Sequence, residues 1–152
     1  MKYEIVTIPK KIIVGKAIKT TNEENKAVND IGTLWQEFIG NGIYNSVNNK
    51  INQMAIGLYT EYKEDYTKEY TFMCGCEVFE VDNTEKLSTK IIPSGKYAKF
   101  TINGHMITAV CQAWSEIWEM NLDRKYTSDF EVYHNDSEDM NNQTIDIYIS
   151  IN

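Results

Sequence analysis

The two prolines of this chain stand at equivalent places in what reads as one unit used twice. Pro9 follows an isoleucine and precedes the strand-like residues 10–15, and Pro93 follows an isoleucine and precedes residues 94–100. After each proline come a helical pattern with tryptophan and then two strand patterns. Such a repeat predicts two lobes related by a pseudo-twofold axis, with a cleft where they meet, and clefts of this kind bind small ligands.

Hydrophobic periodicity and turn residues divide each half into strand, helix, strand and strand. In the first half these elements are expected over residues 3–18 (kinked at Pro9), 20–39, 54–62 and 70–81, with an asparagine-rich loop over 43–52. In the second half they are expected over residues 87–101 (broken at 93–95), 106–118, 129–134 and 144–151. The predicted fold class is therefore α+β, a duplicated β-α-β-β unit. Residues 1–152 form one domain, with halves of about 1–82 and 87–152 joined by the polar connector 82–86.

Charge and composition exclude several classes of protein. The formal net charge of −7 argues against a nucleic-acid-binding protein, which needs a basic face to displace counterions. No apolar run approaches the roughly 20 residues of a membrane-spanning helix. The first residues enter a strand pattern and do not resemble a signal peptide, so we expect a cytoplasmic protein.

The cysteines and histidines do not form a recognisable framework for metal or disulfide chemistry. Cys74 and Cys76 are two residues apart on one face of a strand, which is too close for a normal disulfide, and Cys111 stands apart from them. We interpret Cys74 and Cys76 as buried free thiols. With His105 and His134 as the two histidines, no metal site and no cofactor are expected.

Alternation along the last hairpin separates its two faces. Four isoleucines share one face of the last strand and are expected to lie under the helices, because so much apolar area must be buried: Ile145, Ile147, Ile149 and Ile151. The opposite, open face would then carry Glu131, Tyr133, Asp146 and Tyr148.

The corresponding strand of the first half is interpreted in the same way. Ile56 and Leu58 would face the helices, which leaves Gly57, Tyr59 and Glu61 on the open face. Gly57 thus stands where Glu131 stands in the second copy. One copy has a carboxylate at this place and the other has no side chain.

Together these residues resemble the GyrI-like superfamily, which includes the effector-binding domains of multidrug-sensing transcription activators and free-standing single-domain proteins. The resemblance rests on the order of elements and on Trp114 in the second helix. It rests also on three segments, which are 92–98 (IPSGKYA), the strand from Tyr70 to Val78, and 129–133 (DFEVY). It implies a curved antiparallel sheet with two helices on one face and a ligand cleft at the pseudo-twofold.

The resemblance also implies a role for Glu131, which stands in the family's F-E-x-Y context before Tyr133. In the multidrug sensors this acid meets the positive charge of lipophilic cations, and aromatic rings form the walls of the pocket. A buried carboxylate and tyrosine or tryptophan faces both attract cations.

The other candidate ligand-binding residues each have a second interpretation. Tyr59, Tyr133 and Tyr148 are ligand contacts or ordinary half-buried tyrosines. Trp35 is most simply a core residue, and Trp114 and Trp118 fit a core stripe or a cleft wall. Met73 and Gly75, which alternate with the cysteines, are candidates for the cleft floor, where Gly75 would leave room. Glu61 and Asp146 are interpreted as charges of the rim or the surface.

Three functions are compatible with these residues. The first is a free-standing protein that binds lipophilic compounds, cations among them, through Glu131 in an aromatic cleft. The second is a hydrolase of cyclopropane-containing electrophiles, as in some GyrI-like proteins, in which Glu131 and Tyr133 or Tyr148 act as general base and acid. The third is a protein that binds DNA gyrase or a separate regulator.

Overall fold

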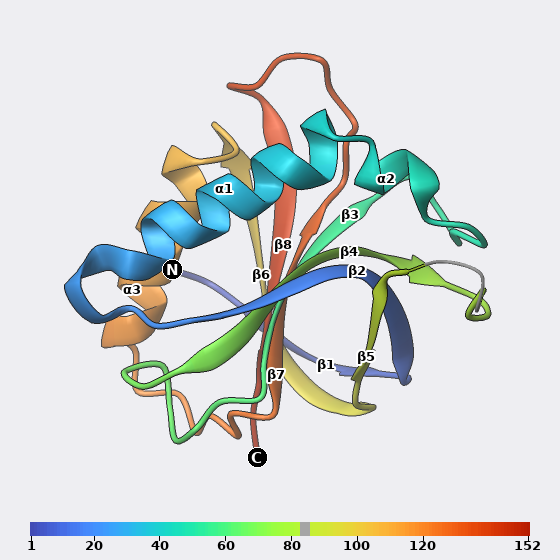
Figure 1. The fold of residues 1–152 in the computed structure, drawn as a ribbon. Helices are drawn as coiled ribbons and strands as arrows, with labels where there is room; N and C mark the ends of the chain where they lie inside the picture. The colour runs from blue at the N-terminus through green and yellow to red at the C-terminus, as the bar shows by residue number, and fades with distance from the viewer. Residues whose placement is uncertain (83–85) are drawn as a thin grey trace.

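The computed structural model describes residues 1–82 and 86–152, and these contain eight strands (Figure 1). The strands of the first half are β1 (Glu4–Ile8), β2 (Lys11–Thr20), β3 (Ala55–Thr60) and β4 (Tyr70–Val78). The strands of the second half are β5 (Ser88–Ile92), β6 (Gly95–Gly104), β7 (Ser128–Tyr133) and β8 (Gln143–Ser150). They form one antiparallel sheet in the order β1-β6-β8-β7-β3-β4-β2-β5, so that β7 and β3 lie side by side at its centre. The α+β class is confirmed.

Both predicted hairpins are confirmed, while the two predicted long strands are each two separate strands. β3 pairs with β4, and β7 pairs with β8. On either side of Pro9, however, β1 pairs with β6 of the second half and β2 pairs with β4 of its own half. Likewise β5 pairs with β2, on the other side of Pro93 from β6. Proline lacks the N–H that a continuous ladder needs, which is why each entry divides where the proline stands.

Two longer helices, α1 (Lys26–Gly40) and α3 (Thr108–Glu119), cover one face of the sheet, and a short helix, α2 (Ile43–Ser46), follows α1 (Figure 1). α1 buries Ala27, Leu34 and Phe38. α3 buries Val110, Ala113, Trp114 and Ile117. In both helices the buried side chains recur at spacings of three, four or seven residues, which keep them on one face.

Two helical boundaries differ from the sequence prediction. Thr20 ends β2, and its hydroxyl donates to Asp30 Oδ2 at 2.8 Å, so it does not cap a helix. A short 3-10 turn, Glu23–Asn25, comes next, and α1 begins after Asn25 adopts a left-handed conformation with φ of 59°. The predicted loop 43–52 begins with α2, which follows Gly42 at φ of 76°, a conformation that glycine adopts without strain.

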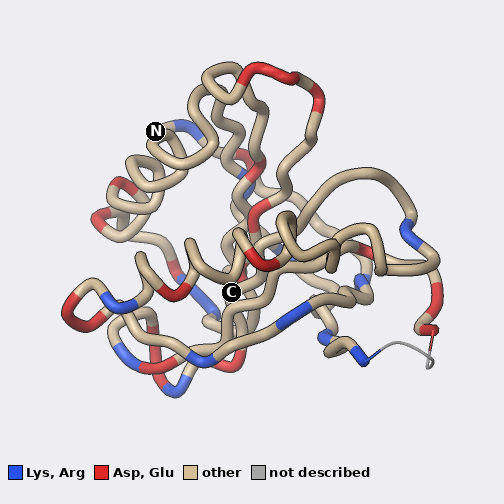
Figure 2. The backbone as a smooth tube through the Cα atoms, turned by 45° about the horizontal axis from the view of Figure 1, so that its top comes forward, with Lys and Arg blue, Asp and Glu red and all other residues tan. Residues whose placement is uncertain are grey.

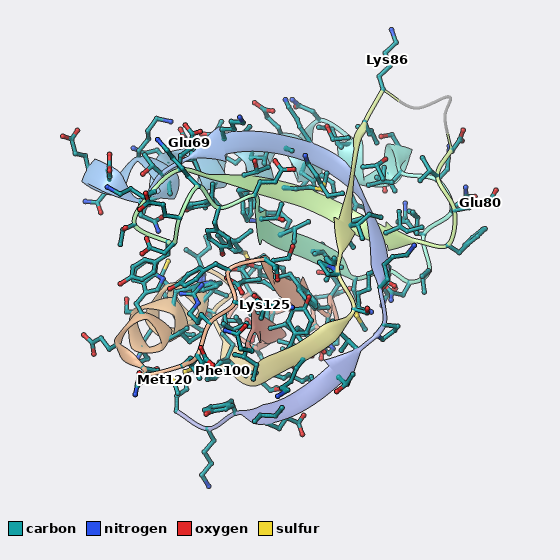
Figure 3. The ribbon with its side chains drawn as sticks, turned by 90° about the horizontal axis from the view of Figure 1, so that it is seen from below. Glu69, Glu80, Lys86, Phe100, Met120 and Lys125 are labelled. Atoms are coloured by element: carbon teal, nitrogen blue, oxygen red, sulfur yellow. The ribbon has the colours of Figure 1, made fainter. Side chains whose placement is uncertain are left out.

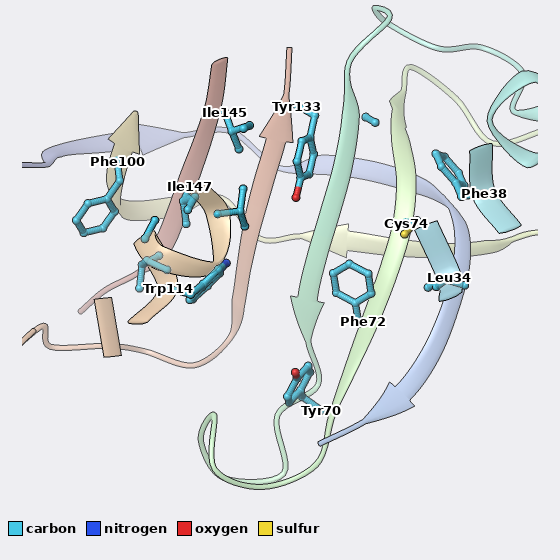
Figure 4. Close-up of a cluster of buried hydrophobic side chains, with 14 of the residues drawn as sticks. Leu34, Phe38, Tyr70, Phe72, Cys74, Phe100, Trp114, Tyr133, Ile145 and Ile147 are labelled. Carbon is cyan, nitrogen blue, oxygen red and sulfur yellow. The ribbon is translucent and has the colours of Figure 1, made fainter. Parts of the chain in front are cut away.

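The central strands of the sheet, β3, β4, β7 and β8, are buried on both faces. The first hydrophobic cluster lies between the sheet and the helices and includes Phe72, Cys74, Trp114, Ile145 and Ile147 (Figure 4). The second cluster lies on the opposite face and includes Ile56, Leu58, Met73, Tyr97 and Phe130. Seen from below, β2, β5, β6 and β1 curve around this second side of the sheet (Figure 3). An antiparallel sheet often leaves one face to solvent, and the curvature explains why this one does not.

The predicted faces are therefore right for one strand and wrong for another. Ile145, Ile147 and Ile149 lie in the helix-side cluster, as expected. Ile56 and Leu58 were expected there too, but they lie in the cluster on the opposite face. The alternation within β3 was correct, and its absolute direction was inverted.

Acidic and basic residues are interspersed over the described chain (Figure 2). Among the described residues, no helix combines the length and apolarity that crossing a membrane requires. Of the predicted connector 82–86, residues 83–85 lie outside the described residues.

Candidate functional site

Glu131 lies in the middle of β7 and is 1% exposed. Its carboxylate accepts three hydrogen bonds from neutral donors. The Tyr59 hydroxyl and the Trp114 indole N–H donate to Oε2 at 2.8 and 2.6 Å, and the Tyr133 hydroxyl donates to Oε1 at 2.7 Å. Figure 4 shows the Trp114 ring and the Tyr133 ring beside β7. The donors come from β3, α3 and β7, so the site exists only when both halves of the chain are assembled.

Gly57 provides the space that the carboxylate occupies. It stands directly opposite Glu131 in the β3–β7 ladder. A Cβ at Gly57 would lie 2.7 Å from Glu131 Oε1 and 3.2 Å from Trp35 Cζ2. The prediction that Gly57 and Glu131 lie on the same face of the sheet is confirmed. The glycine lets the carboxylate lean across the neighbouring strand beneath Trp35.

A set of aromatic rings closes around this acid. Tyr59 packs against Phe72 with ring centroids 4.9 Å apart and against Trp114 at 5.0 Å. Trp35 of α1 meets Tyr133 edge-on at 5.1 Å and Phe72 at 6.3 Å. The two helices thus each contribute a tryptophan over the centre of the sheet.

Burial dominates the electrostatics of the site. Desolvation raises the pKa of Glu131 above the ordinary value of 4.5, although the hydrogen bonds from Trp114, Tyr133 and Tyr59 act in the opposite direction. Burial, followed by the charge of Glu131, raises the pKa values of Tyr59 and Tyr133 well above the ordinary value of 10. Both tyrosines therefore act as neutral donors. Among the described residues, no cationic group hydrogen-bonds to the Glu131 carboxylate or forms an ion pair with it.

A second buried carboxylate, Asp129, lies two residues away on the same face of β7 and is 0% exposed. The Arg124 guanidinium donates to its Oδ2 at 2.6 Å, and the Tyr62 hydroxyl donates to the same oxygen at 2.5 Å. Its Oδ1 accepts from the backbone N–H and the hydroxyl of Ser150 at 2.9 and 3.2 Å. Asp129 thus has a permanent counter-charge, which Glu131 lacks.

The structure brings together most of the residues that the sequence suggested. Those gathered at the carboxylate are Glu131, Tyr133, Tyr59, Gly57, Trp35 and Trp114. Trp118 contacts Trp114 at 6.4 Å but is 39% exposed and stacks on Tyr66. It lies at the outer edge of this group.

The expectation that Tyr148, Met73 and Gly75 share a face with Glu131 is wrong. Glu131 pairs with Ile147, so it lies on the isoleucine face under the helices, and Tyr148 points to the other side. Gly57 pairs with Cys74, which places Cys74 on the Glu131 face and its neighbours Met73 and Gly75 on the opposite face. Antiparallel partners project to the same side of a sheet, which decides the matter. Asp146, expected beside Glu131, also lies on the opposite face, with Val132 as its partner.

Sequence reasoning missed two residues of the aromatic set, Phe72 and Tyr70. Both alternate with Cys74 along β4 and so share the face of Glu131. Burial and then the charge of Glu131 raise the pKa of Tyr70 and of Cys74. The signal was available in the alternation of β4, once that face is assigned to the helix side.

The rings of Tyr59, Trp114, Tyr133 and Trp35 pack around Glu131. Two surface hollows lie elsewhere. One, of about 320 Å³, is lined by residues of β2 and α1, including Lys16, Leu34 and Glu37. The other, of about 240 Å³, lies on the sheet face opposite the helices.

Comparison with known proteins places this geometry in context. Residues 4–151 match a protein-family profile described as Cass2, integron-associated effector binding protein. The crystal structure of the integron cassette protein VCH_CASS2, from the mobile metagenome of Vibrio cholerae, superposes with a TM-score of 0.78 and is 28% identical. This match covers 99% of the present chain and 95% of that one.

Two further similarities differ in what they cover. The structure of SAV2435 bound to tetraphenylphosphonium has a TM-score of 0.83 at 18% identity, over 100% of this chain and 94% of that one, and this likeness concerns the fold. YobU of Bacillus subtilis, named as a candidate transcriptional regulator, is 28% identical over 104 residues. That alignment covers 66% of this chain and 65% of YobU, so it spans less than two thirds of the relative's length.

Proposed function

Because the chain belongs to the Cass2 family of integron-associated effector-binding proteins, we propose that its effectors are lipophilic cations held by Glu131. The observation that carries the proposal is the state of this carboxylate. It is buried and bonded to three neutral donors, and none of the described cationic side chains is bonded to it. SAV2435, which shares the fold, binds the lipophilic cation tetraphenylphosphonium.

A cation at this site offsets the unfavourable burial of Glu131. Desolvating a carboxylate is unfavourable unless an opposite charge or hydrogen bonds compensate for it. The three hydrogen bonds compensate in part, because the pKa of Glu131 is still raised. A bound cation would complete the compensation, and the faces of Trp35, Tyr59 and Trp114 would attract it further.

Binding requires the aromatic rings to move, because they occupy the space above the carboxylate. Trp35 and Tyr59 are only half-buried, so their rings have the shortest way out to solvent. We propose that the ligand separates Trp35 of α1 from Trp114 of α3 and takes their place against Glu131. A flat or propeller-shaped aromatic cation would then replace contacts between rings with contacts of the same kind.

We further propose that the chain is a duplicated unit whose cleft, in the bound state, opens at the centre of the sheet. The strand order supports this, because exchanging each strand of one half for its counterpart in the other reproduces the same order read backwards. The counterparts β3 and β7 are neighbours at the centre, where Gly57 faces Glu131. On this proposal one carboxylate makes a symmetric cleft one-sided.

The test is to titrate the protein with tetraphenylphosphonium at pH 8, following tryptophan fluorescence and calorimetric heat. Glu131→Gln should weaken binding by about 10–100-fold, because it removes the charge and keeps the shape. Glu116→Gln, which removes an exposed carboxylate from α3, is the matched control and should bind like the wild type. Equal affinities of the wild type and Glu131→Gln would contradict the proposal.

The hydrolase alternative uses the same Glu131 and Tyr133 pair, and the same variants separate it from a binding role. Incubation with a cyclopropane-bearing electrophile, followed by mass spectrometry, would show substrate loss with the wild type and none with Glu131→Gln. If the wild type consumed none of the electrophile, the result would contradict the hydrolase alternative and favour the binding role.

A further inference from the structure

The hollow of about 240 Å³ lies on the sheet face opposite Glu131 and is lined by residues of β3, β7 and β8 and by the beginning of β2. Its floor consists of the buried Ile56 and Phe130 and the half-buried Val132. None of these residues takes part in the Glu131 site, because the sheet separates the two. The hollow therefore requires its own explanation.

The side chains of the hollow form a row across four strands. Ile56 pairs with Val132, and Val132 pairs with Asp146, so these three lie side by side on β3, β7 and β8. At one end the row continues diagonally to Glu77 of β4, two residues beyond Gly75, which stands opposite Ile56, and Asp146 ends it at the other. The two acids are three strand spacings apart across the sheet and two residues apart along it. The row is thus polar at both ends and apolar between them.

Each end of the row carries a pair of polar side chains in contact with each other. At one end Lys11 Nζ lies 3.2 Å from Glu77 Oε1, and both side chains are only about a fifth exposed. Among the described residues this is the single hydrogen bond of the Lys11 ammonium, so its other N–H groups and Glu77 Oε2 are available to a ligand. An adjacent ammonium and carboxylate match the two charges of an amino acid.

At the other end of the row, a ligand can form a hydrogen bond with His134, while both oxygens of the Asp146 carboxylate are already bonded. Asp146 accepts from the Thr101 hydroxyl at 2.7 Å, and its second oxygen lies 2.7 Å from His134 Nε2. Both oxygens of Asp146 are therefore engaged, and the half-buried His134 ring forms the accessible edge. The stacked rings of Phe130 and Tyr148, 4.5 Å apart, form the adjoining wall.

From this arrangement we propose that the hollow is a second binding site, for a small zwitterion with an aromatic body and a hydrogen-bonding tip, such as an aromatic amino acid. The carboxylate of the ligand binds Lys11 and its ammonium binds Glu77. Its ring lies over Ile56 and Val132, and its tip reaches His134. The hollow is smaller than the roughly 300–1,000 Å³ of drug-sized pockets, which suits a ligand of amino-acid size.

The test compares four probes by backbone amide NMR shifts at up to millimolar concentration. L-tyrosine has the complete set of groups, tyramine lacks the carboxylate, 4-hydroxyphenylacetate lacks the ammonium, and L-phenylalanine lacks the tip. L-tyrosine should bind most tightly and shift the amides of β3, β7 and β8 around Ile56 and Val132. Removing either charged group should weaken binding by about tenfold, which is typical of one charge-assisted hydrogen bond.

Two variants connect the charges to their partners. Lys11→Met should lower the affinity for L-tyrosine to that for tyramine and leave tyramine binding unchanged. Glu77→Gln should lower the affinity for L-tyrosine to that for 4-hydroxyphenylacetate and leave 4-hydroxyphenylacetate binding unchanged. Lys26→Met, which breaks an exposed ion pair of α1, is the matched control and should alter neither. A merely structural effect of Lys11→Met would weaken all four probes alike and would overturn the assignment.

Independence from the Glu131 site is part of the same test. Glu131→Gln should retain L-tyrosine binding, and Lys11→Met should retain tetraphenylphosphonium binding. The proposal is overturned if none of the probes shifts these amides, or if the shifts gather around Trp35 and Trp114.

Discussion

Two buried carboxylates on one face of β7 differ in whether a cationic side chain is bonded to them. Asp129 is bonded to Arg124, Tyr62 and Ser150, so its charge is balanced within the fold. Glu131, one step along the same face, has three neutral donors instead. Since strand position and burial are alike, the difference between the two lies in the counter-charge. One acid serves the stability of the fold, and we infer that the other is kept for a ligand.

The surroundings of Arg124 strengthen the comparison. Its guanidinium lies over the Tyr126 ring at 4.3 Å and over the Tyr66 ring at 5.7 Å, beside the carboxylate of Asp129. The combination of a buried acid, aromatic faces and a delocalised cation is the one that we propose for Glu131 with its ligand. Asp129 with Arg124 thus shows, two residues away on β7, the arrangement of acid, cation and aromatic rings that we propose for Glu131 and its ligand.

The largest effect is expected when the filled site loses its acid. Asp129→Asn leaves the buried Arg124 without its ion-pair partner, and it should lower the free energy of unfolding by about 3–5 kcal/mol. Glu131→Gln removes an unpaired charge and should change it by no more than about 1 kcal/mol. Denaturant unfolding of both variants measures the contrast. Equal losses would mean that both acids are structural.

A smaller effect is expected from filling the space that Gly57 provides. Gly57→Ala places a methyl group 2.7 Å from Glu131 Oε1 and close to Trp35. Overpacking of this kind should lower stability by about 1–3 kcal/mol and displace the carboxylate, which weakens tetraphenylphosphonium binding. Gly32→Ala, on the open side of α1, is the matched control and should not weaken binding. If Gly57→Ala bound tetraphenylphosphonium as tightly as the wild type, the position of the Glu131 carboxylate would not affect ligand binding.

The two acids also predict a pH dependence, whose sign follows from the raised pKa of Glu131. Between 4.5 and the raised value, the folded state binds more protons at this site than the unfolded state. Glu131 therefore makes the free energy of unfolding fall as pH rises through that window, by at most about 1.4 kcal/mol per pH unit. The free energy of unfolding of the wild type minus that of Glu131→Gln, followed from pH 4 to 8, isolates this contribution and should fall as pH rises. If this difference rose with pH, the pKa of Glu131 would be lowered instead.

The smallest effects concern single hydroxyl groups. Tyr133→Phe removes one donor to the Glu131 carboxylate and should move the midpoint of that pH dependence upward by about one unit, because the charged form loses a hydrogen bond. Tyr148→Phe, on the opposite face, should leave both the midpoint and tetraphenylphosphonium binding unchanged. If Tyr148→Phe behaved like Tyr133→Phe, the two faces of the sheet would be coupled.

Much of the architecture could be predicted from local patterns. Apolar spacing located both main helices, and alternation located the two hairpins. Alternation also placed Gly57 and Glu131 on a common face, which the ladder confirms, whereas their direct pairing is known only from the register of the strands. These features depend on neighbours in sequence or on one alignment of a half with the other, so a single chain contains the information.

The absolute direction of the faces could not be obtained in the same way. Ile145, Ile147 and Ile149 of β8 correctly indicated the helix side of that strand, but the same assignment placed Glu131 on the other face. In the structure Phe130 lies in a second cluster, inside the curve of the sheet. Because β7 is buried on both faces, hydrophobicity does not reveal which one meets the helices. The inter-strand partner of Glu131, which is Ile147, decides it.

By itself, the sequence determined the order of the elements, the α+β class, the resemblance to the GyrI-like superfamily, and the contrast between a carboxylate and a glycine at equivalent places. Only the tertiary structure decided which rings surround Glu131, that Asp129 already has its cation, and that a separate hollow lies behind the sheet. Alternation and spacing act within one element, whereas register and sheet curvature bring together residues from β3, β7, β4, α1 and α3. Register and curvature place the buried Glu131, which has no cationic partner among the described residues, beside Gly57 where β7 meets β3.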